Sequence, residues 1–145
     1  MGKYYKDAEQ LFNVYKAFFQ SITSDEAIGK RLARCGSIIW FEVTDPAYEF
    51  TLDFKNEPAE GAFGAYFLGP CTLEPDIGIS CHSDYFHRFW HGLENPYSAV
   101  ASGKIKFKGS VTSLIRLVPV IKPAFTQFPK VLKNLNLNSM IIKMK

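Results

Sequence analysis

The chain has 145 residues, of which 47 % are hydrophobic and 21 % are charged, a composition that excludes a largely disordered protein. The longest apolar stretch, residues 114–121, contains Arg116 and Pro119 and is far shorter than the ~20 residues that cross a bilayer, which excludes a transmembrane segment. The net charge of +3 is unevenly distributed, because residues 1–103 carry 8 basic and 14 acidic side chains whereas residues 104–145 carry 9 basic ones and no acidic one. This asymmetry predicts a basic surface for an anionic partner.

The N-terminal part of the chain has hydrophobic residues at helical spacing, which predicts an amphipathic helix over residues 7–22. Its apolar stripe consists of Ala8, Leu11, Phe12, Tyr15, Phe18, Phe19 and Ile22. Thr23 and Glu26 form a capping box that predicts the start of a second helix, and Gly36 is expected to end it.

After Gly36 the hydrophobic period changes from helical spacing to two, which is typical of strands with one buried face. The alternation predicts four strands, over residues 38–43, 48–55, 63–68 and 76–82. A turn at Asp45-Pro46 joins the first two into a hairpin. A fifth strand is expected over residues 104–108, with its lysines on one face and Ile105 and Phe107 on the other.

Two helical segments surround this fifth strand in the sequence. Ser83 is expected to cap an aromatic helix over residues 84–91, which ends at Gly92. A final helical region begins after Gly109-Ser110, but three prolines predict that it is broken: Pro119, Pro123 and Pro129.

This order of elements has too few helices between strands for a parallel doubly wound sheet. It predicts an α+β domain with a five-stranded, mainly antiparallel sheet and helices over one face. We expect a single domain over residues 1–145, with a core over about 7–128 and a C-terminal tail over about 129–145. The 13 Phe, 7 Tyr and 2 Trp residues predict an internal cavity or an exposed apolar patch, unless the rings simply form a Phe-rich core.

Three sequence segments resemble the sterol carrier protein 2 family: residues 76–86, the Gly92 turn with Asn95-Pro96, and residues 101–109 followed by an apolar C-terminal helix. The resemblance extends from about residue 10 to about residue 128 and carries no catalytic motif. It implies that the sheet and helices enclose a hydrophobic tunnel for a fatty acyl, sterol or phospholipid ligand. The residues implied to line this tunnel are Phe50, Leu52, Phe54, Phe63, Phe67, Phe86, Phe89, Trp90, Phe107, Leu114, Leu117, Val118 and Ile121.

The basic C-terminal region admits a nucleic acid or an anionic membrane as its partner. No aromatic RNA-binding signature is present, so nucleic acid is not expected, and clustered lysines suffice for an anionic lipid surface. The residues predicted to dock on the membrane are Lys104, Lys106, Lys108, Lys122, Lys130 and Lys133. A homodimer is left open as a further association.

His87 and His91 are spaced four residues apart, which suits two zinc ligands on one helix face. No third ligand accompanies them, so we expect solvent-facing histidines and neither a metal nor another cofactor. Cys35, Cys71 and Cys81 form no C-x-x-C pair, which favours reduced thiols and a cytoplasmic location.

The sequence therefore predicts a non-enzymatic carrier that holds a lipid in an apolar tunnel and exchanges it at membranes. Two alternatives stay open. One is a scaffold that presents a lipid-like intermediate, such as a polyprenyl quinone precursor, to biosynthetic enzymes, and the other is a metal-dependent hydrolase that uses His87 and His91.

Overall fold

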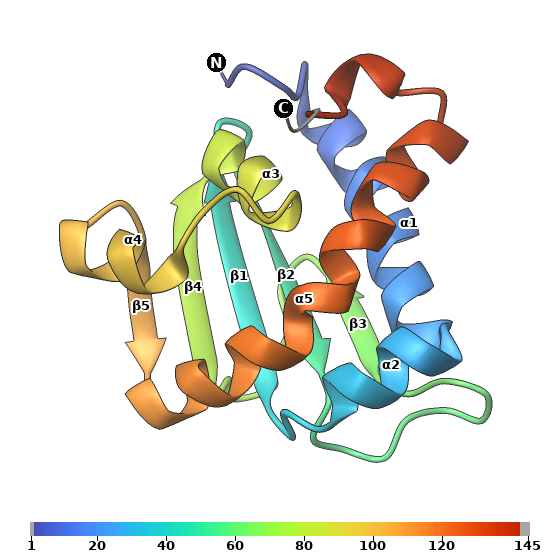
Figure 1. The fold of residues 1–145 in the computed structure, drawn as a ribbon, viewed down its shortest axis with the longest axis vertical. Coiled ribbons are helices and arrows are strands. Elements are labelled where there is room, and N and C mark those ends of the chain that lie inside the picture. The colour runs from blue at the N-terminus through green and yellow to red at the C-terminus, as the bar shows by residue number, and fades with distance from the viewer. Residues whose placement is uncertain (1, 143–145) are drawn as a thin grey trace.

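A computed structural model describes residues 2–142 of the protein. The elements in chain order are α1 (Ala8–Ser24), α2 (Glu26–Ala33), β1 (Ile38–Thr44), β2 (Tyr48–Asp53), β3 (Ala65–Leu68), β4 (Ile77–His82), α3 (Ser83–Trp90), α4 (Pro96–Ser102), β5 (Lys106–Gly109), α5 (Val111–Asn134) and a 3₁₀ turn, η1 (Asn138–Met140). Two layers result, since the helices gather over one face of the sheet (Figure 1).

The sheet has five strands in the order β3-β2-β1-β4-β5. Strands β1 and β4 run parallel, and the other three neighbouring pairs are antiparallel. The predicted α+β class and the mainly antiparallel sheet are confirmed.

The register of the strands decides which side chains face the helices. Phe41 in β1 lies beside Phe50 in β2 and Ile79 in β4, and all three are buried beneath the helices. Their neighbours in sequence point to the opposite, outer face, where Thr51 pairs with Phe67. Phe67 is 39 % exposed on this outer face, so the prediction that it lines the interior is wrong.

Aromatic rings fill the centre of the space between the sheet and the helices. Phe18 meets the rings of both Trp90 and Phe128 with centroids 4.8 Å apart and nearly perpendicular planes, a favourable edge-to-face arrangement. Tyr15 lies 4.8 Å from Phe86 by the same measure. The middle of the layer, where a tunnel was expected, is therefore close-packed.

Two helix starts differ from the sequence prediction. The carboxylate of Asp25, not the hydroxyl of Thr23, caps α2 by accepting from the backbone N–H of Ile28 at 2.9 Å. The Thr23 hydroxyl instead donates back to the carbonyl of Phe19 in α1. At α3 the capping group is the His82 imidazole, which accepts from the N–H of Asp84, so the prediction of Ser83 as the cap is also wrong.

The long C-terminal helix α5 is continuous over 24 residues, which contradicts the predicted break. Pro123 has no N–H to donate to the carbonyl of Pro119, but the Arg31 guanidinium of α2 lies 3.4 Å from that carbonyl oxygen. A side chain from a neighbouring helix thus replaces the missing donor. Figure 1 shows that α5 follows a curved path across the helical layer.

The fifth strand begins two residues later than predicted, because the preceding residues end a helix that the sequence analysis missed. Gly103 closes α4 with a positive φ of 77°. The N–H of Lys104 then donates to the carbonyl of Ala99, as in a helix C-terminal cap. Lys104 and Ile105 therefore belong to the helix end rather than to β5.

Candidate functional site: an apolar groove beside α5

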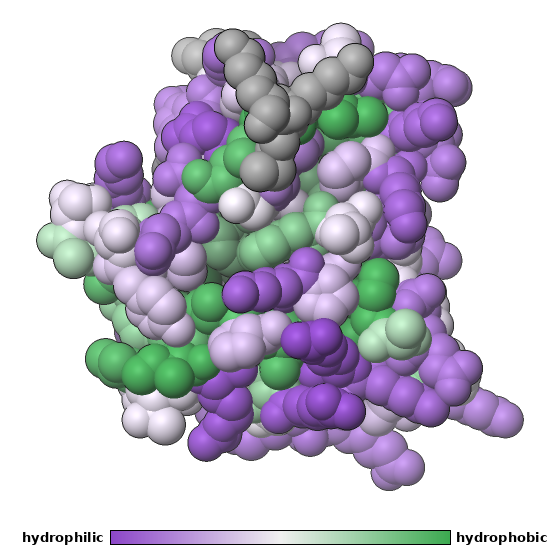
Figure 2. Space-filling model, in the orientation of Figure 1, coloured by the Kyte–Doolittle hydropathy of each residue, from purple (hydrophilic) through white to green (hydrophobic). Residues whose placement is uncertain are grey.

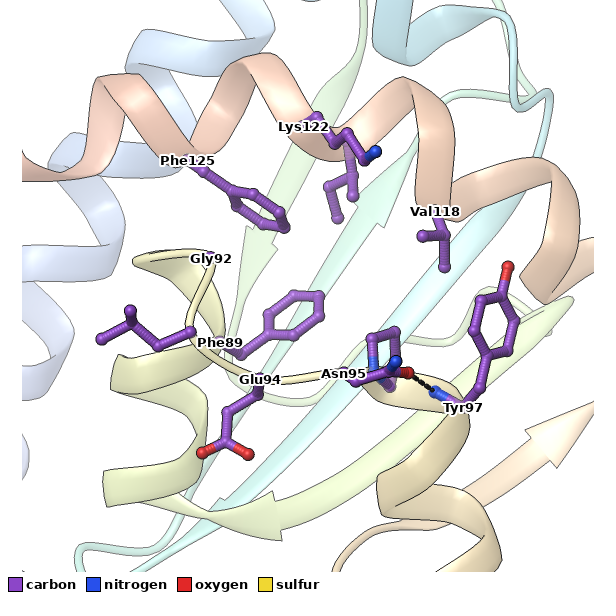
Figure 3. Close-up of a pocket in the computed structure, with 11 residues that line it drawn as sticks. Phe89, Gly92, Glu94, Asn95, Tyr97, Val118, Lys122 and Phe125 are labelled. Carbon is purple, nitrogen blue, oxygen red and sulfur yellow. Dashed lines mark hydrogen bonds between the residues drawn. The ribbon is translucent and has the colours of Figure 1, made fainter. Parts of the chain in front are cut away.

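An open groove of about 420 Å³ lies between α5 and the segment that leads from α3 into α4. It is lined by Phe89, Gly92, Leu93, Glu94, Asn95, Pro96, Tyr97, Val118, Ile121, Lys122 and Phe125. Figure 3 shows the rings of Phe89 and Phe125 in the space between the two segments, with Tyr97 opposite Val118. In Figure 2 hydrophobic residues gather in the hollow along the middle of this face, flanked by hydrophilic ones.

Local backbone structure holds the groove open on the α3–α4 side. Gly92 turns the chain away from α3 with a φ of 75°, and a Cβ atom at this position would approach the Phe125 ring to 3.1 Å. Three residues later the Asn95 side chain accepts from the N–H groups of Tyr97 and Ser98, which starts α4 with Pro96 in its first turn. The segment therefore has a fixed path along the groove.

A second, nearly closed void of about 10 Å³ lies deeper, between the sheet and α3. It is lined by Phe41, Ile79, Cys81, Tyr85, Phe86, Phe89, Pro96 and Ile105. Phe89 and Pro96 border both spaces, so they form the wall between the groove and this inner void. The void is only large enough for about one water-sized probe.

Two polar side chains border the inner void, and both are neutral at physiological pH. Burial raises the pKa of the Cys81 thiol to about 12, and burial followed by the charge of Glu94 raises the pKa of Tyr85 to about 12. The Tyr85 hydroxyl is buried and has no hydrogen-bond partner among residues 2–142.

The charges around the groove are not balanced. The Arg88 guanidinium lies 2.9 Å from the carboxylate of Glu94, and this hydrogen bond raises the pKa of Arg88. Within the described residues, 2–142, the Lys122 ammonium has no ion-pair partner. Lys122 is thus the uncompensated cation of an otherwise apolar groove.

The structure separates the residues predicted to line a tunnel into three groups. Phe89, Val118 and Ile121 line the groove, and Phe86 lies with Phe89 at the inner void. A second group is buried in the aromatic centre and its surroundings without bordering either space: Phe50, Leu52, Trp90, Leu114 and Leu117. Phe54 is buried in the same core, whereas Phe63 lies against Gly29 of α2 and Phe107 pairs with Ile79 in the sheet. A ligand contact of any of the predicted residues stays a prediction.

Sequence reasoning missed several lining residues on the α3–α4 side and Phe125 on α5. The Asn95-Pro96 dipeptide was the available signal, because an N-cap residue followed by proline is typical of a helix start. On α5 the available signal was helical spacing, because Phe125 follows Ile121 by four residues and Val118 by seven.

The six lysines predicted to dock on a membrane are all exposed, but they do not form one patch. Lys106 and Lys108 pair with Ser80 and Gly78 on the outer face of the sheet, whereas Lys122 lines the groove in the helical layer. Membrane docking by all six at once is therefore not supported by their arrangement.

The prediction that His87 and His91 face solvent is wrong, since they are only 0 % and 7 % exposed. His87 Nε2 lies 2.7 Å from the Met140 carbonyl and must donate to it, so Nδ1 accepts from the Tyr5 hydroxyl. His91 Nδ1 donates to the His87 carbonyl, and its Nε2 accepts from the N–H of Ile142.

All four ring nitrogens of this pair are thus engaged, and neither ring offers a lone pair to a metal ion in this arrangement. Within residues 2–142 no three His, Cys, Asp or Glu side chains are grouped closely enough to hold a metal ion. The two histidines instead tie α3 to the N-terminal and C-terminal segments, which lie side by side in Figure 1.

None of the helices in the described part of the chain combines the length and hydrophobicity required to cross a bilayer. The three cysteines are present as free thiols. The cytoplasmic location that they indicated stays a prediction.

Comparison with known proteins extends the description of the fold. The model of the SCP-2 sterol transfer family matches residues 16–122. No curated protein sequence matches the chain.

Three solved structures have a similar fold. The sterol carrier protein domain 2 of Helicoverpa armigera shares 20 % identity and a TM-score of 0.62, over 80 % of this chain and 88 % of that one. The apo form of sterol carrier protein 2 from Yarrowia lipolytica shares 21 % identity and a TM-score of 0.58, over 79 % of this chain and 88 % of that one. A ubiquinone synthesis protein, UbiJ-SCP2, shares 12 % identity and a TM-score of 0.54, over 77 % of this chain and 88 % of that one. At these identities the similarity concerns the fold alone, so the scaffold alternative stays a prediction.

Proposed function

Because the chain belongs to the SCP-2 sterol transfer family, we propose that it is a lipid carrier that holds its ligand in the groove between α5 and the α3–α4 segment. The observation that carries this proposal is the apolar lining, in which Phe89, Ile121 and Phe125 face a space that no other part of residues 2–142 fills. A carrier requires binding and release but no covalent step.

The size of the groove is compatible with useful affinity. Its volume of about 420 Å³ falls within the roughly 300–1,000 Å³ typical of small-molecule sites. Micromolar binding corresponds to about −8.2 kcal/mol, which at ~25 cal/mol per Å² requires about 330 Å² of buried apolar ligand surface. The free-energy cost of association raises this requirement, so a ligand that gains apolar contact beyond the open groove would bind more tightly.

Phe89 offers a route to this additional contact. Its ring separates the groove from the inner void, and a rotation of the side chain would join the two spaces. The ligand chain then extends past Phe89 toward Phe41 and Ile79 on the inner face of the sheet. This extended site would correspond to the tunnel that the family resemblance implied.

Exchange at a membrane is the second part of the proposal. Val111 and Ile115 are 65 % and 54 % exposed and lie on the same face of α5 as Val118, at spacings of four and three residues. Leu93 and Tyr97 expose further apolar surface on the opposite side of the groove. Shallow insertion of this rim would place the groove against the lipid, with Lys122 available to an anionic head group.

Mass spectrometry of the purified protein under native conditions tests for a retained lipid directly. A blocking variant tests the site: Val118→Trp fills the groove and should weaken the binding of a fluorescent fatty acid at least about tenfold. Ile115→Trp places the same side chain one turn earlier on the exposed part of α5 and should leave binding in solution unchanged. Equal affinities of both variants and the original protein would refute the groove as the binding site.

A further inference from the structure

The groove carries a feature that bears on which lipids it selects. Among the residues that line it, Lys122 and Glu94 are the charged ones, and Glu94 is already neutralised by Arg88 at 2.9 Å. The Lys122 ammonium therefore supplies a net positive charge at an apolar surface. Figure 3 shows the Lys122 side chain extending from α5 on the side of Val118.

The opposite side of the groove adds neutral hydrogen-bond donors. The carbonyl oxygen of the Asn95 side chain is occupied by the N–H groups of Tyr97 and Ser98, which leaves its NH₂ group to donate. The exposed Tyr97 hydroxyl lies on the same side. The groove thus has one unpaired cation on the α5 side and two neutral donors on the opposite side, whereas its one carboxylate is paired.

From this arrangement we propose that the groove selects anionic amphiphiles, with Lys122 as the specificity-determining residue that binds a carboxylate or phosphate head group. The inference rests on the proposed function, because the apolar part of the same ligand occupies the groove. The alkyl chain contacts Phe89, Ile121 and Phe125 while the head group stays at the solvent-exposed mouth, where its charge keeps most of its hydration.

The energetic balance favours an anion over a neutral head group without excluding the latter. When a neutral alcohol binds, the Lys122 ammonium stays hydrated at no free-energy cost. The alcohol therefore differs from an anion only in lacking the attraction to this ammonium. Charge-assisted hydrogen bonds are stronger than neutral ones, and partial exposure limits the gain. We expect a preference of about five- to tenfold for the anion, decreasing as salt screens the charge.

Isothermal titration at pH 8 with three probes that share one alkyl chain measures this preference: dodecanoic acid and dodecyl phosphate below their micellar concentrations, and dodecanol below its solubility limit. The full chain should bind both anions about five- to tenfold more tightly than the alcohol. Lys122→Met keeps the apolar stem of the side chain. It should reduce the preference for anions to less than about twofold without weakening the binding of dodecanol. A preference for only one of the two anions, if Lys122→Met removes it, would support the assignment of Lys122 and identify the head group as carboxylate or phosphate.

Two further variants keep the test specific. Arg116→Met removes a cation from the same helix but outside the groove, and it should retain the preference for anions. Lys122→Glu should lower the affinity for dodecanoate below that for dodecanol and raise the affinity for dodecylamine. Retention of the anion preference by Lys122→Met, or its equal loss in Arg116→Met, would overturn the assignment of Lys122 while leaving the carrier function intact. Failure of the original protein to bind any of the probes would overturn the proposed function and this inference with it.

Discussion

Lowering the pH from 7.5 to 5 should destabilise the folded protein, because His87 is completely buried in its neutral form. Its Nδ1 accepts from the Tyr5 hydroxyl and its Nε2 donates to the Met140 carbonyl, so protonation would make Nδ1 a donor and force the buried Tyr5 hydroxyl, which also bonds the Tyr15 hydroxyl at 2.8 Å, to reorient. Burial is the main cause that lowers the pKa of His87 from 6.5 to about 4, and the hydrogen bond to the Met140 carbonyl and the charge of Asp84 only partly offset it.

The sign and size of the effect follow from this difference in pKa. The unfolded chain takes up a proton near pH 6.5 while folded His87 does not, so its contribution to stability is complete above that pH and is lost as the pH falls toward 4. Proton linkage between a pKa of 6.5 and one of about 4 lowers the free energy of unfolding by about 2 kcal/mol at pH 5. His91 acts in the same direction, because burial lowers its pKa too.

Urea unfolding followed by tryptophan fluorescence at pH 7.5 and 5 measures this loss, with the free energy of unfolding obtained by linear extrapolation. The glutamine in His87→Gln cannot take up a proton in this range. On acidification, the free energy of unfolding of this variant should therefore fall by at least about 1 kcal/mol less than that of the original protein. His82→Gln changes the partly exposed histidine at the start of α3 and should retain the full loss. A free energy of unfolding that stays constant between the two pH values, or an undiminished loss in His87→Gln, would refute the reasoning.

Three further predictions concern the α3–α4 side of the groove and the position of Phe67 on the outer face of the sheet. Asn95→Ala removes the cap of α4 and should lower the free energy of unfolding by about 1 kcal/mol in urea titrations, while Ser98→Ala, in the same first turn, should change it by less than about half of that. Gly92→Ala places a Cβ atom on a residue with positive φ and against Phe125. It should therefore lower the free energy of unfolding by about 1–2 kcal/mol and shift the affinity for fatty acids. A change in the free energy of unfolding below about 0.5 kcal/mol would contradict the described turn. Phe67→Ser lies on the outer face of the sheet and should leave fatty acid affinity unchanged, whereas a substantial loss would show that this face takes part in binding.

The sequence predicts the sheet well because alternation is a local property. Ile39, Phe41 and Val43 repeat every second residue and all face the helices, as expected for a strand with one buried face. The same reasoning fails for Phe67, whose side-chain direction depends on the register of β3 against β2 rather than on hydrophobicity. A strand that carries aromatic residues on both faces gives no clear signal of which face is buried.

The histidines show a different limit of sequence reasoning. Their helical angle places them away from Phe86 and Phe89, which suggests solvent exposure for an amphipathic surface helix. Helix α3 is instead covered on that side as well, because Tyr5 and Met140 come from the two ends of the described chain. Contacts between segments so distant in sequence leave no periodic pattern, and so no local signal could predict them.

The position of the groove follows from where the aromatic core ends. In the middle of the layer, rings such as Phe18 and Trp90 meet edge to face with centroids 4.8 Å apart and leave no room for a ligand. At the margin, Phe89 and Phe125 also meet at a steep angle, but beyond them Gly92 has no side chain and the capped start of α4 holds the backbone at a fixed distance from α5. The aromatic residues therefore form the filled, Phe-rich core that the composition allowed, and the groove lies at the edge of this core. The proposed ligand site is therefore defined by the glycine turn and the helix cap rather than by missing volume in the core.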